Sequence, residues 1–111
     1  MVLEGEKVLF VKHAPRTGDG KWTLPEGFLE VDESTARGAA RELAEETNIR
    51  TSPEYLILVR TGRYVENPDE GSILSICFVA ERKLTTGNPE VGEEPTEVRF
   101  WDPQELLESD E

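Results

Sequence analysis

The order of apolar and polar positions predicts a strand, a long helix and then further strands. Val8 to Val11 form a short apolar run between charged residues, which is typical of a buried strand. From Ser34 to Thr47, small and apolar side chains recur every three or four positions, which is the stripe of an amphipathic helix. Asp32 or Ser34 can cap the start of this helix.

The second half of the chain predicts paired strands and a short closing helix. Residues 54–65 and 72–82 are rich in β-branched and aromatic side chains, and the turn-forming residues 67–71 connect them. Residues 97–101 predict another strand, and residues 103–108 predict a short helix with proline in its first turn. This order predicts an α/β or α+β fold, in which helices pack on the faces of a mixed sheet.

Length and charge narrow the classes of function. A chain of 111 residues has the usual length of one domain, so we expect a single domain over residues 1–111. The net charge of −12 disfavours a nucleic-acid-binding surface, which needs surplus lysine and arginine. No apolar run approaches the roughly 20 residues that cross a bilayer, and the start lacks the layout of a signal peptide. We therefore expect a cytoplasmic protein with a small-molecule ligand and with no nucleic-acid or membrane partner.

Three glutamates on the predicted helix are the strongest candidates for chemistry. Glu42, Glu45 and Glu46 stand at i, i+3 and i+4, and a helix with about 3.6 residues per turn places their carboxylates on one face. Like charges at this spacing destabilise a helix unless a cation lies among them. Carboxylates without histidine or cysteine nearby favour Mg²⁺, with Mn²⁺ as a substitute, and Mg²⁺ in proteins commonly binds substrate phosphates. The alternative is a solvated acidic face without a ligand.

The sequence around these glutamates resembles the Nudix box, G-x5-E-x7-R-E-U-x-E-E-x-G-U, in which U is a bulky apolar residue. The segment GFLEVDESTARGAARELAEETNI fits every fixed position of the box but one. The matching residues are Gly27, Glu33, Arg41, Glu42, Leu43, Glu45, Glu46 and Ile49. Residues 22–25, WTLP, are also similar to the W-x-L-P that precedes the box in many members. The resemblance covers nearly the whole chain and implies an α/β/α sandwich around a mixed sheet.

The resemblance also implies roles for the matching residues. The metal would be held by the three glutamates of the helix face and by the backbone carbonyl of Gly27. Arg41 would orient a catalytic glutamate through an ion pair. Glu33 stands at the start of the helix, where it can reach Arg37 and interact favourably with the helix dipole.

The box does not name the general base. In different members of the family this base is a glutamate of the box or a glutamate from a distant loop. Glu93 and Glu94 lie where such a loop residue would come, and Glu94 is the preferred candidate, with a solvated acid in an acidic tail as the alternative. The candidate catalytic residues are therefore Arg41, Glu42, Glu46 and Glu94.

The chain departs from the family pattern at three places. Asn48 stands where the box has glycine, but asparagine is a common substitute in the left-handed conformation that ends a helix, so we expect the geometry to survive. Glu26 replaces a second glycine that many members carry before the box, and it adds a carboxylate beside the metal loop. The start is short, because members carry a fuller strand where this chain has Met1 to Glu4. A missing strand would leave an open sheet edge, which a second subunit could cover in a homodimer.

The G-[FY]-L-E run at residues 27–30 resembles the branch of the family that hydrolyses ADP-ribose and related dinucleotides. This implies a Mg²⁺-dependent hydrolase that cleaves the diphosphate linkage of a nucleoside diphosphate joined to another group. Arg16 and Lys21 are candidates for binding the substrate phosphates, and Tyr64 or Phe78 for stacking on a base. The alternatives are a MutT-type nucleoside triphosphate pyrophosphatase and a catalytically silent domain that binds a nucleotide or a partner protein.

Overall fold

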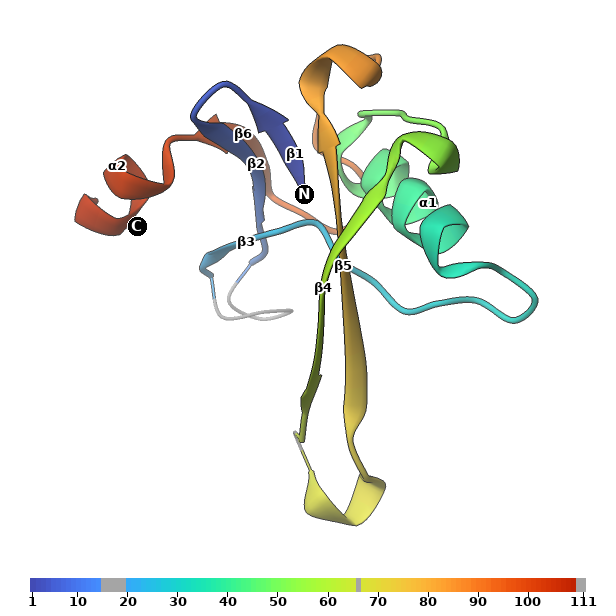
Figure 1. Ribbon diagram of the computed structural model, residues 1–111. Helices are drawn as coiled ribbons and strands as arrows, with labels where there is room; N and C mark the ends of the chain where they lie inside the picture. Colours follow the sequence, from blue (N-terminus) through green and yellow to red (C-terminus); the bar gives the residue numbers. More distant parts are fainter. Residues whose placement is uncertain (15–19, 66, 110–111) are drawn as a thin grey trace.

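The computed structural model describes residues 1–14, 20–65 and 67–109, which form one mixed sheet with two helices (Figure 1). The strands are β1 (Val2–Glu4), β2 (Lys7–Lys12), β3 (Trp22–Thr23), β4 (Ile57–Tyr64), β5 (Ile73–Glu81) and β6 (Glu97–Trp101). The helices are α1 (Thr35–Thr47) and α2 (Pro103–Glu108), and short 3-10 turns span Pro53–Tyr55, Pro68–Glu70 and Arg82–Leu84. Every element that the sequence pattern predicts is present, which confirms the expected fold class.

The sheet contains both parallel and antiparallel pairs. Its strand order is β3-β2-β1-β5-β4, and β6 pairs with β2 outside this path. β1 runs parallel to β5, whereas the other strand pairs are antiparallel. The sequence pattern does not predict β1 and β3, because strands of three and two residues are too short to show alternation.

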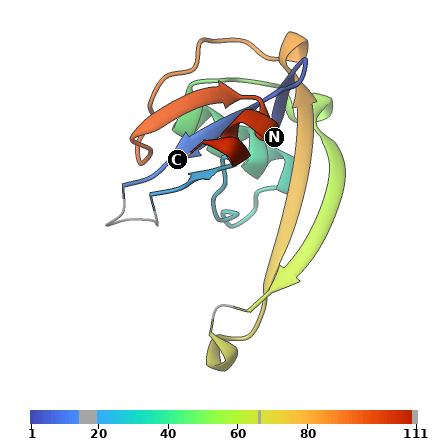
Figure 2. The same ribbon diagram turned by 90° about the vertical axis from the view of Figure 1, so that its left-hand side faces the viewer.

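β1 is present and lies between β2 and β5, where it joins the two halves of the sheet, so the open edge expected at a missing N-terminal strand does not form there. On one side Leu3 lies opposite Val8 of β2, and on the other side Val2 lies opposite Ala80 of β5. The backbone N–H of Ala80 donates to the carbonyl of Met1 at 2.9 Å. From this junction the β4–β5 hairpin extends away from the body of the protein as a long arm (Figures 1 and 2).

The hydrophobic core lies where α1 meets the sheet. It consists of Val2, Leu9, Leu43 and Ile49, all at most 5% exposed, and partly buried Val98 and Phe100 pack against it. Leu43 is the residue of α1 that enters this cluster, so the core fixes the rotation of the helix about its axis. Glu42, Glu45 and Glu46, which precede and follow Leu43 in the helix, are thereby held at the border of the core.

Both ends of α1 are capped as the sequence predicts. At the start, Ser34 rather than Asp32 is the cap, and its hydroxyl accepts a hydrogen bond from the backbone N–H of Arg37 at 3.2 Å. At the end, Asn48 has the left-handed conformation, with φ of 65°, and its N–H donates to the carbonyl of Ala44 at 3.0 Å. The asparagine at the glycine position of the box therefore preserves the helix end.

The two helices lie on opposite sides of the sheet, which Figures 1 and 2 show from perpendicular directions. α1 covers the side on which the box residues lie, and α2 lies beyond β2 and β6. This arrangement is the expected α/β/α sandwich. In the part of the chain that the structure describes, neither helix has the length and apolar character needed to cross a membrane.

Thr47 offers a test of the junction between α1 and the core. Its fully buried hydroxyl donates to the carbonyl of Leu43 at 2.6 Å and accepts the N–H of Ile49 at 3.1 Å. Thr47→Val keeps the shape of the side chain but leaves this N–H without its partner, so the free energy of unfolding should fall by about 1–3 kcal/mol in urea denaturation. Thr61→Val, on the exposed arm, is the control and should change it by less than about 0.5 kcal/mol. Equal losses of unfolding free energy in Thr47→Val and Thr61→Val would contradict the role of the Thr47 hydroxyl.

Candidate functional site

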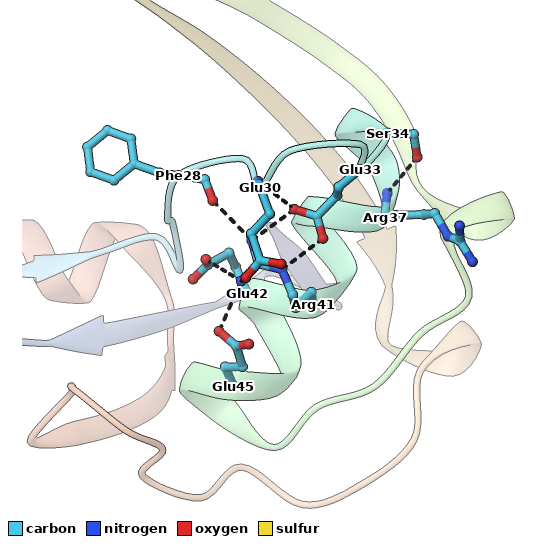
Figure 3. Close-up of polar contacts among 8 residues, drawn as sticks. All are labelled: Phe28, Glu30, Glu33, Ser34, Arg37, Arg41, Glu42 and Glu45. Carbon is cyan, nitrogen blue, oxygen red and sulfur yellow. Dashed lines mark hydrogen bonds and ion pairs between the residues drawn. The ribbon is translucent and has the colours of Figure 1, made fainter.

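The guanidinium of Arg41 lies between the loop before α1 and the carboxylates of α1 (Figure 3). Its Nε and Nη2 donate to the two carboxylate oxygens of Glu33, at 2.8 and 2.9 Å. Nη2 also donates to the backbone carbonyl of Phe28 at 3.0 Å, while Nη1 donates to Glu42 at 2.7 Å and to Glu45 at 3.1 Å. Because the guanidinium donors point in fixed directions, this one side chain sets the position of the loop relative to the helix.

Glu33 is bound by Arg41 through two hydrogen bonds, one to each of its carboxylate oxygens. The hydrogen bond from Arg41 lowers the pKa of Glu33 to about 2, and the backbone N–H of Glu30 contributes to the same shift. Arg37, which the sequence offered as the partner of Glu33, acts on it only through its charge, whereas the carboxylate binds Arg41, eight residues further along. Glu33 precedes the cap residue Ser34, so its side chain belongs to the loop and does not follow the i, i+4 spacing of the helix surface.

Two glycines allow the loop to lie directly on α1. A Cβ atom at Gly27 would overlap the carboxylate of Glu42. A Cβ atom at Gly38 would lie 2.7 Å from Cδ1 of Leu29 and 2.9 Å from Oε1 of Glu33. Gly27, which the sequence predicts as a backbone ligand of the metal, therefore lies against one of the predicted carboxylate ligands.

Glu46 is the most unusual group of the site. It is only 5% exposed, and its Oε2 has no hydrogen-bond partner among the described residues. The pKa of Glu46 is raised to about 7, mainly by burial; the backbone N–H of Glu26 opposes this shift, and the charges of Glu42 and Glu94 add to it. Burial also raises the pKa of Glu42, and the hydrogen bond from Arg41 opposes this shift. A buried carboxylate without a partner is costly unless a proton or a cation completes it.

The predicted metal ligands share one face but do not converge on one point. As the side chains lie, no group of three or more histidine, cysteine, aspartate or glutamate residues within residues 1–14, 20–65 and 67–109 could hold a metal ion. The physical reason is that Glu42 and Glu45 both turn toward Nη1 of Arg41. The donor set itself nevertheless suits a hard cation, because it consists of carboxylate oxygens and includes the unpaired Oε2 of Glu46.

A cleft of about 1250 Å³ runs along this face of the protein. The predicted site residues that line it are Lys21, Gly27, Arg41, Glu42, Glu45, Glu46, Phe78 and Glu94. Sequence reasoning missed His13 and Phe28, which line the same cleft. Phe28 belongs to the G-[FY]-L-E run but was given no role of its own, and His13 is a single histidine without a pattern around it, so only the fold places the two side chains at the cleft. Arg16 and the side chain of Tyr64 lie outside the described residues, and their assigned roles stay predictions.

Glu94 lies close enough to the helix face for its charge to act there. It raises the pKa of both Glu42 and Glu46, and it lines the cleft together with them. The structure thus brings Glu94 into the neighbourhood of the box glutamates, although it follows them by about fifty residues in the sequence. Its assignment as the general base stays a prediction.

Comparison with known proteins yields consistent matches. The model of the NUDIX domain matches residues 1–111. The chain is 34% identical over 108 residues to a MutT-like protein of Streptomyces ambofaciens, which covers 97% of the chain and 63% of that protein. It is 35% identical over 80 residues to phosphatase NudJ of Escherichia coli K12, which covers 72% of the chain and 50% of NudJ. The chain therefore spans only part of the length of these relatives.

A solved structure shares the fold. The NUDIX domain of Shewanella oneidensis NrtR, in complex with ADP ribose, superposes with a TM-score of 0.74 at 23% identity. The match covers 96% of the chain and 70% of the NrtR domain.

The raised pKa of Glu46 predicts how the stability of the metal-free protein depends on pH. The folded pKa is about 7 against an ordinary value of 4.5, so between these values the folded protein binds more protons than the unfolded chain. Its free energy of unfolding should therefore decrease as pH rises from 4.5 to 7, with no further change from this group above 7. Because glutamine cannot ionise, Glu46→Gln should be more stable than the wild type by about 1–3 kcal/mol at pH 8 and by much less at pH 5.

Urea unfolding in the presence of a chelator measures this difference. Glu105→Gln, on the exposed surface of α2, is the matched control and should change stability little at either pH. A gain of equal size at pH 5 and pH 8 would contradict the raised pKa of Glu46.

The contacts of Arg41 predict that lysine cannot replace it. The single ammonium of Arg41→Lys cannot reach Glu33, the Phe28 carbonyl and the helix carboxylates together, and each lost charge-assisted hydrogen bond contributes about 1.5–3 kcal/mol. Hydrogen exchange of the amides in residues 28–33 should accelerate by more than about tenfold, read by mass spectrometry. Arg37→Lys, on the exposed surface of the same helix, should leave this exchange unchanged. Unchanged exchange in Arg41→Lys would show that the loop does not depend on the guanidinium.

Proposed function

Since the chain belongs to the NUDIX domain family, we propose that it is a divalent-metal-dependent hydrolase of the diphosphate linkage in nucleoside diphosphates joined to another group. The observation that carries this proposal is the buried Oε2 of Glu46, unpaired within the described chain, on the face that also bears Glu42 and Glu45. Carboxylates arranged in this way destabilise the protein on their own, and a bound cation removes that penalty. Strongly perturbed carboxylates in a cleft are characteristic of functional sites.

We assign the metal to Glu42, Glu45 and Glu46, with the backbone carbonyl of Gly27 as a further ligand. An oxygen-only donor set suits Mg²⁺, and Mn²⁺ is the expected substitute. When bound, the ion would neutralise the negative charge that develops on the phosphate oxygens. Glu42 and Glu45 would have to leave Nη1 of Arg41 in order to bind it, whereas the contacts of Arg41 with Glu33 and Phe28 could persist.

We assign the remaining roles to Glu94, Lys21, Arg16 and Arg41. The carboxylate of Glu94, which lines the same cleft as Glu42 and Glu46, accepts a proton from the attacking water. The water oxygen then bonds to phosphorus, and the bridging oxygen of the diphosphate leaves with its electron pair. Lys21 on the wall of the cleft, together with Arg16, binds the substrate phosphates. Arg41 positions the glutamates and does not contact the reacting atoms.

ADP-ribose or a related dinucleotide is the preferred substrate. The cleft of about 1250 Å³ exceeds the roughly 300–1000 Å³ of common small-molecule pockets, so it can accommodate both halves of a dinucleotide. Phe28 and Phe78 add two aromatic surfaces to its walls. The likeness in fold to the NrtR domain that binds ADP ribose supports the same choice. The alternative is hydrolysis of nucleoside triphosphates, which the identity of 34% to a MutT-like protein supports.

A substrate panel tests the proposal. With Mg²⁺ or Mn²⁺, the purified protein should convert ADP-ribose into AMP and ribose 5-phosphate, whereas MutT-type activity would release pyrophosphate from nucleoside triphosphates. Glu46→Gln should lower kcat at least about 100-fold, and the exposed variant Glu105→Gln should keep full activity. If no diphosphate derivative or triphosphate is turned over with either ion, the proposed activity is wrong. Nucleotide binding without turnover would instead support the silent binding domain.

A further inference from the structure

We propose that Gly92 is a positioning residue, which holds the loop that carries Glu94 against the end of α1 so that Glu94 faces the glutamates of that helix. This inference rests on the proposed function, because it assigns Gly92 to the geometry of the same site. It concerns residues 90–93, called here the strap, which cross the C-terminal end of α1.

The strap binds the last carbonyl groups of α1. The backbone N–H of Glu90 donates to the carbonyl of Thr47 at 2.9 Å, that of Gly92 to Glu46 at 3.0 Å, and that of Glu93 to Glu45 at 3.2 Å. The carbonyls at the end of a helix have no partner within the helix, so a distant segment that binds them is a structural anchor. Two of the three carbonyls belong to candidate metal ligands, and the strap is therefore connected directly to the site.

Gly92 is the point of closest approach. A Cβ atom there would overlap the carbonyl oxygen of Glu45, and it would lie 2.7 Å from the carbonyl carbon of Glu45 and 2.8 Å from Cα of Glu46. All three atoms belong to the helix backbone, so they cannot turn away as a flexible side chain could. The contact therefore requires glycine, since any side chain would push the strap off the helix.

A second anchor holds the loop on the other side of Glu94. Both the backbone N–H and the hydroxyl of Thr96 donate to the carbonyl of Lys12, at 2.7 and 3.0 Å. Pro95, next to Glu94, is buried. Glu94 thus lies between an anchor on α1 and an anchor on β2, and it lines the same cleft as Glu42 and Glu46. Release of the α1 anchor would leave Glu94 held from one side only.

Displacement of the strap should therefore affect the chemical step more than the binding steps. A misplacement of about 1 Å in a reacting group can reduce a rate by about 100-fold. Gly92→Ala should lower kcat by about 10- to 100-fold, with KM and the Kd for Mn²⁺ changed by less than about threefold. Isothermal titration with Mn²⁺ alone measures the Kd for the metal, and it shows whether the metal ligands on α1 have stayed in place.

Gly87→Ala is the matched control. Gly87 belongs to the same stretch of chain, has a φ of +93°, and a Cβ atom there would overlap the carbonyl oxygen of Asn48. The substitution should therefore destabilise the fold at the end of α1 in a comparable way, but it lies ahead of the strap. We expect a lower Tm for both variants and a loss of kcat for Gly92→Ala alone.

Two further measurements decide whether Gly92 acts through the strap and Glu94. Hydrogen exchange at residues 90–93 should accelerate in Gly92→Ala and stay slow in Gly87→Ala, and this readout needs neither metal nor activity. In a double-mutant cycle, Gly92→Ala should cost little further activity once Glu94→Gln is present. The proposal is overturned by any one of four results. These are unchanged hydrogen exchange in the strap of Gly92→Ala, an equal loss of kcat in Gly87→Ala, a loss of Mn²⁺ binding in Gly92→Ala, and additive effects of Gly92→Ala and Glu94→Gln on activity.

These outcomes are distinct from a failure of the proposed function. If the wild type hydrolyses no substrate of the panel, the enzyme assignment is wrong, and hydrogen exchange still decides whether Gly92 docks the strap. If the wild type is active and Glu94→Gln retains full activity, the hydrolase stands while the positioning role of Gly92 is overturned.

Discussion

The contact between Arg41 and Glu33 is the interaction on which the site depends. Two hydrogen bonds of 2.8 and 2.9 Å join the guanidinium to this loop carboxylate, and a third at 3.0 Å fixes the carbonyl of Phe28. Gly27 and Gly38 remove the side chains that would otherwise keep the loop away from α1. The core residue Leu43 holds the helix from the opposite side. Loop, guanidinium and helix therefore form one rigid unit that presents the glutamates to the cleft.

Within this unit, the glutamates carry more negative charge than the single guanidinium of Arg41 can neutralise. Arg41 interacts with Glu42 and Glu45, but the buried Oε2 of Glu46 finds no partner in the described part of the chain. A fold optimised for stability alone would place an apolar residue at this position. The retained carboxylate, with its pKa raised to about 7, supports our proposal that this site binds a cation. The strap that leads to Glu94 brings a further carboxylate to the same place.

The sequence was most informative where one element carries the pattern. The limits of α1, its caps at Ser34 and Asn48, and the shared face of its glutamates all follow from spacing along a single helix. β3 escaped prediction because it is too short to alternate, and β1 was expected only from the resemblance, which did not place it inside the sheet. The hydrogen-bonding partner of Glu33 was not predicted because Glu33 lies in the loop before α1, where the spacing of the helix does not apply. The place of Phe28 at the cleft and the fit of Gly92 against α1 depend on tertiary contacts, which a local sequence pattern does not specify.

The position of a bound metal relative to Glu42, Glu45 and Glu46 decides whether these glutamates form a metal site. Crystals of the protein grown with Mn²⁺ can be measured at the manganese absorption edge, where anomalous scattering locates the ion independently of any assumed ligands. We expect one ion within coordination distance of Glu42, Glu45 and Glu46. The carboxylates of Glu42 and Glu45 should then have left Nη1 of Arg41, while Glu33 should still be bound to Nε. An ion bound elsewhere, or both carboxylates still on Arg41 at saturating Mn²⁺, would contradict this expectation.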